Sequence, residues 1–168
     1  MKEKTPVFTY ADKGKMAQLL PGLFELLHEN MSKIAPTGNT YEEDYASWSS
    51  CVLPAMEKEQ RQIVLMHVGG SFAGYFQYYV TADKERLMME EIQIKKEFQG
   101  SGLFAGFYQW LVKQLPGDIE HVEAYANKKN FKSQAILEHL GLQRVGENKN
   151  GNSFFFRGKY ADLRKKYI

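Results

Sequence analysis

The sequence predicts an α+β fold with a central mixed, mostly antiparallel sheet flanked by helices. Segments with apolar residues at helical spacing precede a group of strands rich in aromatic residues. A glycine-rich turn then joins the last of these strands to an apolar helix, and a strand, a helix and a hairpin complete the order. At 168 residues with 43% hydrophobic residues, the chain is expected to form a single domain over residues 1–168.

The N-terminal segment predicts a short strand followed by a helix. Residues 6–10 are typical of a strand, and Asp12 is placed to cap a helix. The apolar residues that recur at helical spacing are Met16, Leu20, Leu23, Leu27 and Met31. Pro21 lies inside this segment, and we expect it to kink or split the helix.

A second helix is predicted after the loop at residues 35–39. Thr40 and Glu43 have the spacing of a capping box, in which each side chain accepts a hydrogen bond from the other residue's backbone amide. The residues that continue along one face are Tyr41, Tyr45, Trp48 and Val52. We expect this helix to end at Pro54.

The remaining elements follow from β-forming residues, glycines and prolines. Strands are predicted at residues 63–68, 72–80, 87–94, 119–126, 142–145 and 154–156. Helices are predicted at residues 102–115 and 131–140. The glycines at 69 and 70 predict a hairpin turn, and Gly141 predicts the end of the second of these helices.

Composition and charge exclude several classes of protein. The 22 basic and 20 acidic side chains give a net charge of +2, which implies binding to neither nucleic acid nor an anionic membrane. The N-terminus lacks the apolar core of a signal peptide, and no apolar run approaches the roughly 20 residues that a membrane span requires, so we expect a cytoplasmic protein. The single cysteine, Cys51, excludes an internal disulfide, and no two histidines have metal-ligand spacing, so no metal is expected.

The segment at residues 92–104 predicts an anion-binding site. An alternating apolar strand ends there in a turn with Gly100 and Gly102 that opens directly into a helix. The glycines let a ligand approach the backbone, and the first amides of a helix have no intrahelical acceptor, so they favour a phosphate. The spacing differs from that of the usual nucleotide-binding loops, because no Gly-Lys-Ser/Thr follows and the third glycine of a dinucleotide fingerprint is missing.

This loop resembles the Gln/Arg-x-x-Gly-x-Gly/Ala pyrophosphate loop of the GNAT N-acetyltransferase superfamily. Gln99 and Gly102 match that pattern, and Phe104 replaces its final Gly/Ala. A second segment is similar to the family's Asn-x-x-Ala/Ser helix start: Asn130-x-x-Ser133 begins eleven residues before the glycine of Gly-Leu, where the family has Gly-Phe.

The resemblance implies the GNAT acyl-CoA N-acyltransferase fold, with acetyl-CoA as co-substrate. It implies a transferase that moves an acetyl group to a primary amine by direct attack. In the family, the strand before the loop pairs with the pantetheine arm, and the helix-start asparagine both caps its helix and faces the coenzyme. The residues implied to bind the coenzyme are Ile92, Gln93, Ile94, Gln99, Gly100, Ser101, Gly102, Leu103, Phe104, Ala105, Asn130 and Ser133.

Glu90 and Glu91 are the candidates for the general base. An ammonium group must lose a proton before it can attack a thioester, so the site needs a carboxylate, preferably with a raised pKa. Strand alternation sends the two side chains to opposite faces, and only one can face the cleft. The chain resembles the diamine acetyltransferases here, which have an acidic pair with the first member near the amine, so Glu90 is favoured; a solvated strand glutamate is the alternative.

The general acid is less clearly marked. Leu137 stands where many family members have the tyrosine that protonates the leaving thiolate. We name Tyr125 as the catalytic candidate, with Tyr108 as a second and water as a third source of the proton; packing in the core or the sheet is the alternative for both tyrosines. Cys51 would suggest an acyl-enzyme, but it is expected to pack on a helix face.

The expected partner is a small-molecule or peptide amine, with a homodimer possible, and no nucleic acid and no membrane. The acidic residues at 42–44 could select a cationic amine together with the aromatic residues near them, or could simply complement the helix dipole. Two other readings stay open: a GNAT-fold acyl-CoA binding or sensing module without activity, and a nucleotide-binding domain unrelated to acyl transfer.

Overall fold

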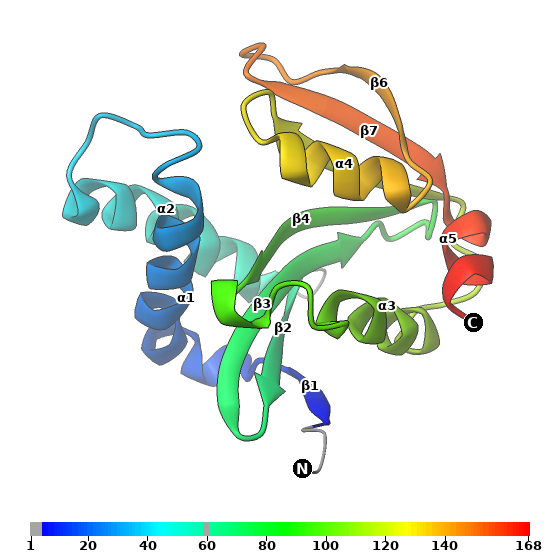
Figure 1. The fold of residues 1–168 in the computed structure, drawn as a ribbon, viewed down its shortest axis with the longest axis horizontal. Coiled ribbons are helices and arrows are strands. Elements are labelled where there is room, and N and C mark those ends of the chain that lie inside the picture. Colours follow the sequence, from blue (N-terminus) through cyan, green and yellow to red (C-terminus); the bar gives the residue numbers. More distant parts are fainter. Residues whose placement is uncertain (1–4, 59–60) are drawn as a thin grey trace. The chain divides into compact units, whose positions relative to one another are not determined.

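The computed structural model describes residues 5–58 and 61–168, and seven strands of these residues form one mixed sheet (Figure 1). The order across the sheet is β1-β2-β3-β4-β5-β7-β6. The strands are β1 Pro6–Tyr10, β2 Arg61–Val68, β3 Ser71–Val80, β4 Arg86–Ile94, β5 His121–Asn127, β6 Gln143–Glu147 and β7 Ser153–Lys159. The α-helices are α1 Met16–Met31, α2 Tyr41–Glu57, α3 Leu103–Gln114, α4 Phe131–His139 and α5 Tyr160–Tyr167.

The predicted fold class is confirmed. β1 with β2, β5 with β7, and β6 with β7 are antiparallel pairs, whereas β4 and β5 are parallel. The predicted strands and helices occur in the predicted order, with boundaries that differ by a few residues. The sequence analysis did not predict α5 as a separate element.

The described chain groups into two compact units. The first unit is Met1–Gln77 with Glu91–Gly106, and the second is Tyr78–Glu90 with Phe107–Ile168. Strands β3 and β4 and helix α3 each contribute residues to both units. The expectation of a single domain stays a prediction.

In the first unit, Asp12 is an N-cap as expected, but it caps the short 3-10 helix that precedes α1 and not α1 itself. Its carboxylate accepts a hydrogen bond from the Gly14 amide at 2.9 Å and starts a 3-10 turn, Lys13–Lys15, that leads into α1. Pro21 was expected to kink or split α1, and it does not split the helix, which runs from Met16 to Met31. Both Pro21 and Ala17, whose carbonyl loses its partner, are exposed, so water can bond to that carbonyl.

Helices α1 and α2 pack together in the first unit (Figure 1). The predicted capping box of α2 is confirmed: the Glu43 amide donates to Thr40 Oγ1 at 3.1 Å, and the Thr40 amide donates to Glu43 Oε1 at 3.2 Å. The helix continues past Pro54 to Glu57. The buried residues of this core are Ala11, Met16, Leu20, Leu23, Leu26, Val52, Met56, Ile63 and Tyr75.

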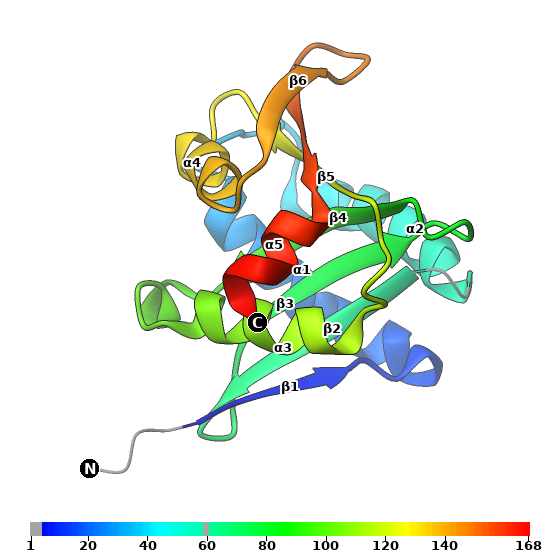
Figure 2. The same ribbon diagram turned by 90° about the vertical axis from the view of Figure 1, so that its right-hand side faces the viewer.

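In the second unit, β5 pairs with β7 along its whole length, and β6 pairs with the other side of β7 as the edge strand (Figure 2). Helix α5 follows β7 directly and buries Tyr160 and Leu163. Glu123 on β5 is buried but is paired with two cations, Arg86 at 3.4 Å and Arg157 at 3.5 Å. A buried carboxylate with two such partners is a structural ion pair rather than a reactive group.

Candidate functional site

The glycine-rich turn in the first unit has the geometry that the sequence predicted. Gly100 and Gly102 have φ values of 77° and 85°, which side-chain-bearing residues rarely adopt, and the space beside each Cα is open. From the sequence, this turn was expected to follow β4 directly. Instead, a 3-10 turn, Lys96–Phe98, lies between the strand and the glycines. The backbone at both glycines is therefore accessible to a ligand.

The start of α3 supplies backbone donors next to this turn. The Gly106 amide donates to the Gly102 carbonyl at 3.1 Å, which begins the bonding of the helix. The first four amides of an α-helix lack an intrahelical acceptor, and their dipoles add to a partial positive charge. Ser101 Oγ donates to the Phe98 carbonyl at 2.5 Å and holds the turn closed. This is a suitable place for a phosphate oxygen.

The end of β4 is held by one side chain from the loop that follows it and by one from α1. The Ile94 carbonyl accepts a hydrogen bond from Gln99 Nε2 at 2.9 Å and another from Asn30 Nδ2 of α1 at 3.1 Å. Gln99, the residue that matched the loop pattern, thus shapes the loop through its side chain. Asn30 was not anticipated, since an asparagine near a helix end has no sequence signal for a distant partner.

A glycine opposite this strand allows a close approach. A Cβ at Gly74 on β3 would lie 2.4 Å from the Gln93 carbonyl oxygen, so no side chain fits there. Sequence reasoning missed this residue, although a glycine inside a strand is the usual signal of close backbone approach.

Glu91 and Gln93 lie two residues apart on β4, and their side chains interact. Gln93 Nε2 donates to Glu91 Oε1 at 2.5 Å, and Gln93 Oε1 accepts from Asn30 Nδ2 at 2.9 Å. Burial raises the pKa of Glu91 from 4.5 to about 7, and the hydrogen bond from Gln93 opposes that rise. A carboxyl group with such a pKa can exchange a proton near neutral pH.

Tyr75 of β3 is the ionisable neighbour of this carboxyl group. It is fully buried, and among the described residues its hydroxyl has no hydrogen-bond partner. Burial, and then the charge of Glu91, raise the pKa of Tyr75 well above its ordinary value. Tyr75 is therefore neutral wherever Glu91 titrates.

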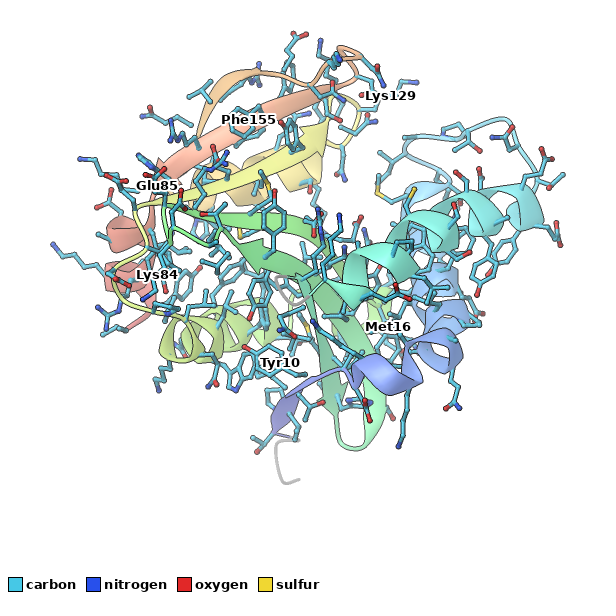
Figure 3. All side chains as sticks on the ribbon, turned by 180° about the vertical axis from the view of Figure 1, so that it is seen from behind. Tyr10, Met16, Lys84, Glu85, Lys129 and Phe155 are labelled. Atoms are coloured by element: carbon cyan, nitrogen blue, oxygen red, sulfur yellow. The ribbon has the colours of Figure 1, made fainter. Side chains whose placement is uncertain are left out.

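In the second unit, the structure brings Glu90 and Tyr125 together. Both line a cavity of about 220 Å³, whose other walls are Tyr79, Met88 and Met89. The parallel pairing of β4 and β5 runs to Met89 and Ala124, so these two residues follow the last pair. Tyr125 is 50% exposed, and its ring centre lies 5.0 Å from that of Phe155. Phe155 itself lies on β7 (Figure 3).

Tyr108, the second candidate acid, is a core residue. It is buried, its hydroxyl lies 3.5 Å from Met89 Sδ, and its ring stacks on Tyr167. Burial raises its pKa far above the ordinary value, which makes it a poor proton donor.

The helix-start motif lies in the second unit. Asn130 caps α4 by accepting a hydrogen bond from the Ser133 amide at 3.0 Å, as its spacing predicted. Gln134 fastens the preceding turn with two hydrogen bonds to the Asn127 and Lys128 carbonyls, both at 3.0 Å. Leu137 is buried at 7% exposure and offers no proton.

Two further expectations concern residues of α2. Cys51 is exposed, so the expectation that it packs was wrong, because it faces away from the side of α2 that buries Val52 and Met56. Asp44 accepts a hydrogen bond from Thr37 Oγ1 at 2.6 Å, and the Glu43 amide donates to Thr40 Oγ1, so both residues hold the start of α2 in place.

Residues 5–58 and 61–168 contain no cluster of His, Cys, Asp and Glu that could hold a metal, and no helix there is long and apolar enough to cross a membrane.

A larger cavity, about 650 Å³, lies in the first unit. Its walls are Gly22, Glu25, Leu26 and Glu29 of α1, Phe72 of β3, and Lys95, Lys96 and Glu97. The Lys95 ammonium lies 5.5 Å above the Phe72 ring. Charges of both signs line this cavity, so it has no strong preference for a single ligand charge.

Solved structures share this fold. An acetyltransferase from Thermus thermophilus has a TM-score of 0.72 at 18% identity, over 95% of this chain and 99% of that chain. A protein from Desulfovibrio desulfuricans assigned to the GNAT acetyltransferases has a TM-score of 0.67 at 15% identity, over 92% and 99%. An aminoglycoside acetyltransferase in complex with coenzyme A and kanamycin has a TM-score of 0.68 at 16% identity, over 98% and 100%.

These similarities define the class of fold: the chain has the fold of the GNAT acetyltransferases. No protein-family model and no curated protein matches the sequence.

Proposed function

We propose that this protein is an acetyl-CoA-dependent N-acetyltransferase. The observation that carries the proposal is the turn with left-handed glycines at 100 and 102, which leads into the start of α3 within a GNAT fold. Such a turn presents backbone donors to a pyrophosphate. The similar aminoglycoside acetyltransferase was solved with coenzyme A, which supports this choice of ligand.

The coenzyme would be held by backbone groups more than by side chains. The amides of residues 100–105 would bind the pyrophosphate, and the backbone of Ile92–Ile94 would pair with the pantetheine arm. Asn130 and Ser133 at the start of α4 are proposed as further coenzyme contacts from the family resemblance alone. No basic side chain is needed for this mode of binding, because the helix start itself favours an anion.

The acceptor would be a primary amine, and Glu91 would be its base. The sequence favoured Glu90, but the raised pKa of Glu91, about 7, is the better match to a base working at neutral pH. Glu91 takes a proton from the ammonium group, directly or through water, and the amine nitrogen then attacks the thioester carbonyl carbon. The carbon–sulfur bond breaks, and the thiolate takes a proton from water. Tyr125, the acid named from the sequence, lines the cavity of Glu90 and not the side of β4 on which Glu91 lies.

A panel of amines tests the proposal. Purified protein with acetyl-CoA is offered a polyamine, an aminoglycoside, free lysine and a peptide with an open N-terminus, and release of coenzyme A thiol is followed. Amine-dependent release supports the transferase. Saturable binding of acetyl-CoA without release for any amine would favour a binding or sensing module, which the apolar Leu137 at the usual acid position also suggests. Tight binding of ATP or NAD in place of coenzyme A would contradict both.

A further inference from the structure

We propose that Gln93 is a positioning residue for Glu91, and that Asn30 of α1 fixes the direction in which the Gln93 amide points. Its catalytic meaning rests on the proposed function, since Glu91 is the base assigned there. The hydrogen-bonded chain itself belongs wholly to the first unit and does not depend on that assignment.

The direction of each amide follows from the backbone. The Ile94 carbonyl can only accept a hydrogen bond, so the group of Asn30 that lies 3.1 Å from it must be the NH2 group. The same nitrogen lies 2.9 Å from the Gln93 side chain, which must therefore turn its oxygen towards Asn30. The NH2 group of Gln93 is then left facing the Glu91 carboxyl group.

This arrangement is costly to reverse. Gln93 is only 7% exposed, so water has little access to replace its hydrogen bonds. If the amide flipped, two oxygens would face each other at Glu91 and two NH2 groups would face each other at Asn30. Because unmatched buried polar groups destabilise a fold, one orientation is strongly preferred.

The orientation decides which form of Glu91 is favoured. An NH2 donor stabilises the ionised carboxylate over the neutral acid, and it opposes the effect of burial. The ionisable group on β3 that acts on Glu91 is Tyr75, which is neutral at the pH values where Glu91 titrates. The group on α1 that contacts Gln93 is Asn30, which carries no charge. Gln93 is thus the described neighbour that keeps the Glu91 pKa from rising further above neutrality.

The test measures the Glu91 pKa in the full chain without relying on activity. Glutamate side-chain carboxyl carbons are followed by 13C NMR against pH, and Glu91→Gln identifies the Glu91 signal. Gln93→Met keeps the length of the side chain but removes the donor, and the pKa of Glu91 should rise by roughly one pH unit. Asn30→Leu removes the group that orients Gln93, and it should raise the same pKa by a smaller amount.

Gln134→Met is the matched control. Gln134 is also a 7% exposed glutamine whose NH2 group donates buried hydrogen bonds, but it belongs to the second unit. Gln134→Met should lower the stability of the protein about as much as Gln93→Met does, and it should leave the Glu91 pKa unchanged. A general loss of stability is thereby separated from a specific effect on Glu91.

The outcomes distinguish this inference from the proposed function. If Gln93→Met raises the Glu91 pKa but no amine releases thiol, the positioning role stands and the transferase proposal fails. If thiol is released but a folded Gln93→Met keeps the parent Glu91 pKa, the positioning role is overturned. Should Gln93→Met fail to fold, an unchanged pKa in Asn30→Leu overturns it, because Gln93 would then keep its direction without Asn30.

Discussion

Glu91 connects the stability of this protein to pH at the scale of one residue. Its pKa is raised from 4.5 to about 7 in the folded chain, so the folded state holds the proton more tightly than the unfolded state. The resulting stability is fully present below pH 4.5 and is lost as the pH rises through 7, by about 3 kcal/mol in all. Glu91→Gln removes the titrating group, so its stability relative to the parent should increase between about pH 5 and 8. Urea unfolding of both proteins at several pH values measures this, and parallel curves would contradict the raised pKa.

The two glutamates of β4 should differ in their effect on the rate. Glu91→Gln should lower kcat by roughly 10²-fold to 10⁴-fold, the range for a positioned general base, and leave coenzyme affinity nearly intact. In the parent, kcat/KM should rise with pH through about 7, because the carboxylate is the active form. Glu90→Gln is the matched variant, with an expected loss of less than about tenfold. The reverse ranking, measured with an accepted amine, would return the base to Glu90.

Tyr125 is the tyrosine to test against water as the source of the thiolate proton. Its exposed ring lines the same cavity as Glu90, whereas the Tyr108 hydroxyl is buried against Met89. If Tyr125 protonates the thiolate, the parent rate should fall at high pH near the ordinary tyrosine pKa of about 10, and Tyr125→Phe should remove that fall. Tyr108→Phe should keep it. Identical profiles in all three proteins would indicate that water supplies the proton.

The loop between β4 and α3 is tested at the scale of the element. Gly102→Glu adds bulk and negative charge where a phosphate is proposed, and coenzyme A binding should be abolished in calorimetry. The positive φ of 85° adds strain of about 1–2 kcal/mol, which a folded domain can tolerate. Gly102→Ala carries similar strain without the charge and should keep measurable affinity. Unchanged affinity in a folded Gly102→Glu would contradict the loop assignment.

At the scale of the whole molecule, we predict one cooperative unfolding transition. Strands β3 and β4 each supply residues to both compact units, so the unfolding of either unit breaks strands that continue into the other. Scanning calorimetry should give equal calorimetric and van 't Hoff enthalpies. Coenzyme A at about 100 times its Kd should add about 2.7 kcal/mol to the stability. Two separate transitions, with only one shifted by the ligand, would contradict the single domain.

The sequence by itself determined most of the elements and the glycine turn between β4 and α3, because their signals are local. The Thr40–Glu43 capping box, the Asn130 cap and the glycines at 100 and 102 act within a few residues of the chain, and the structure has all of them as expected. The sequence could not show that α1 would continue through Pro21, because the exposed position of Pro21 in the fold makes the lost hydrogen bond tolerable.

Tertiary structure alone decided the environment of the candidate base. The choice between Glu90 and Glu91 depends on burial and on partners distant in the chain, since Asn30 is 63 residues from Gln93. Strand alternation separates the two carboxylates but cannot say on which side of the strand a hydrogen-bond donor lies. A pKa depends on desolvation and on nearby hydrogen bonds, and both exist only after the chain has folded.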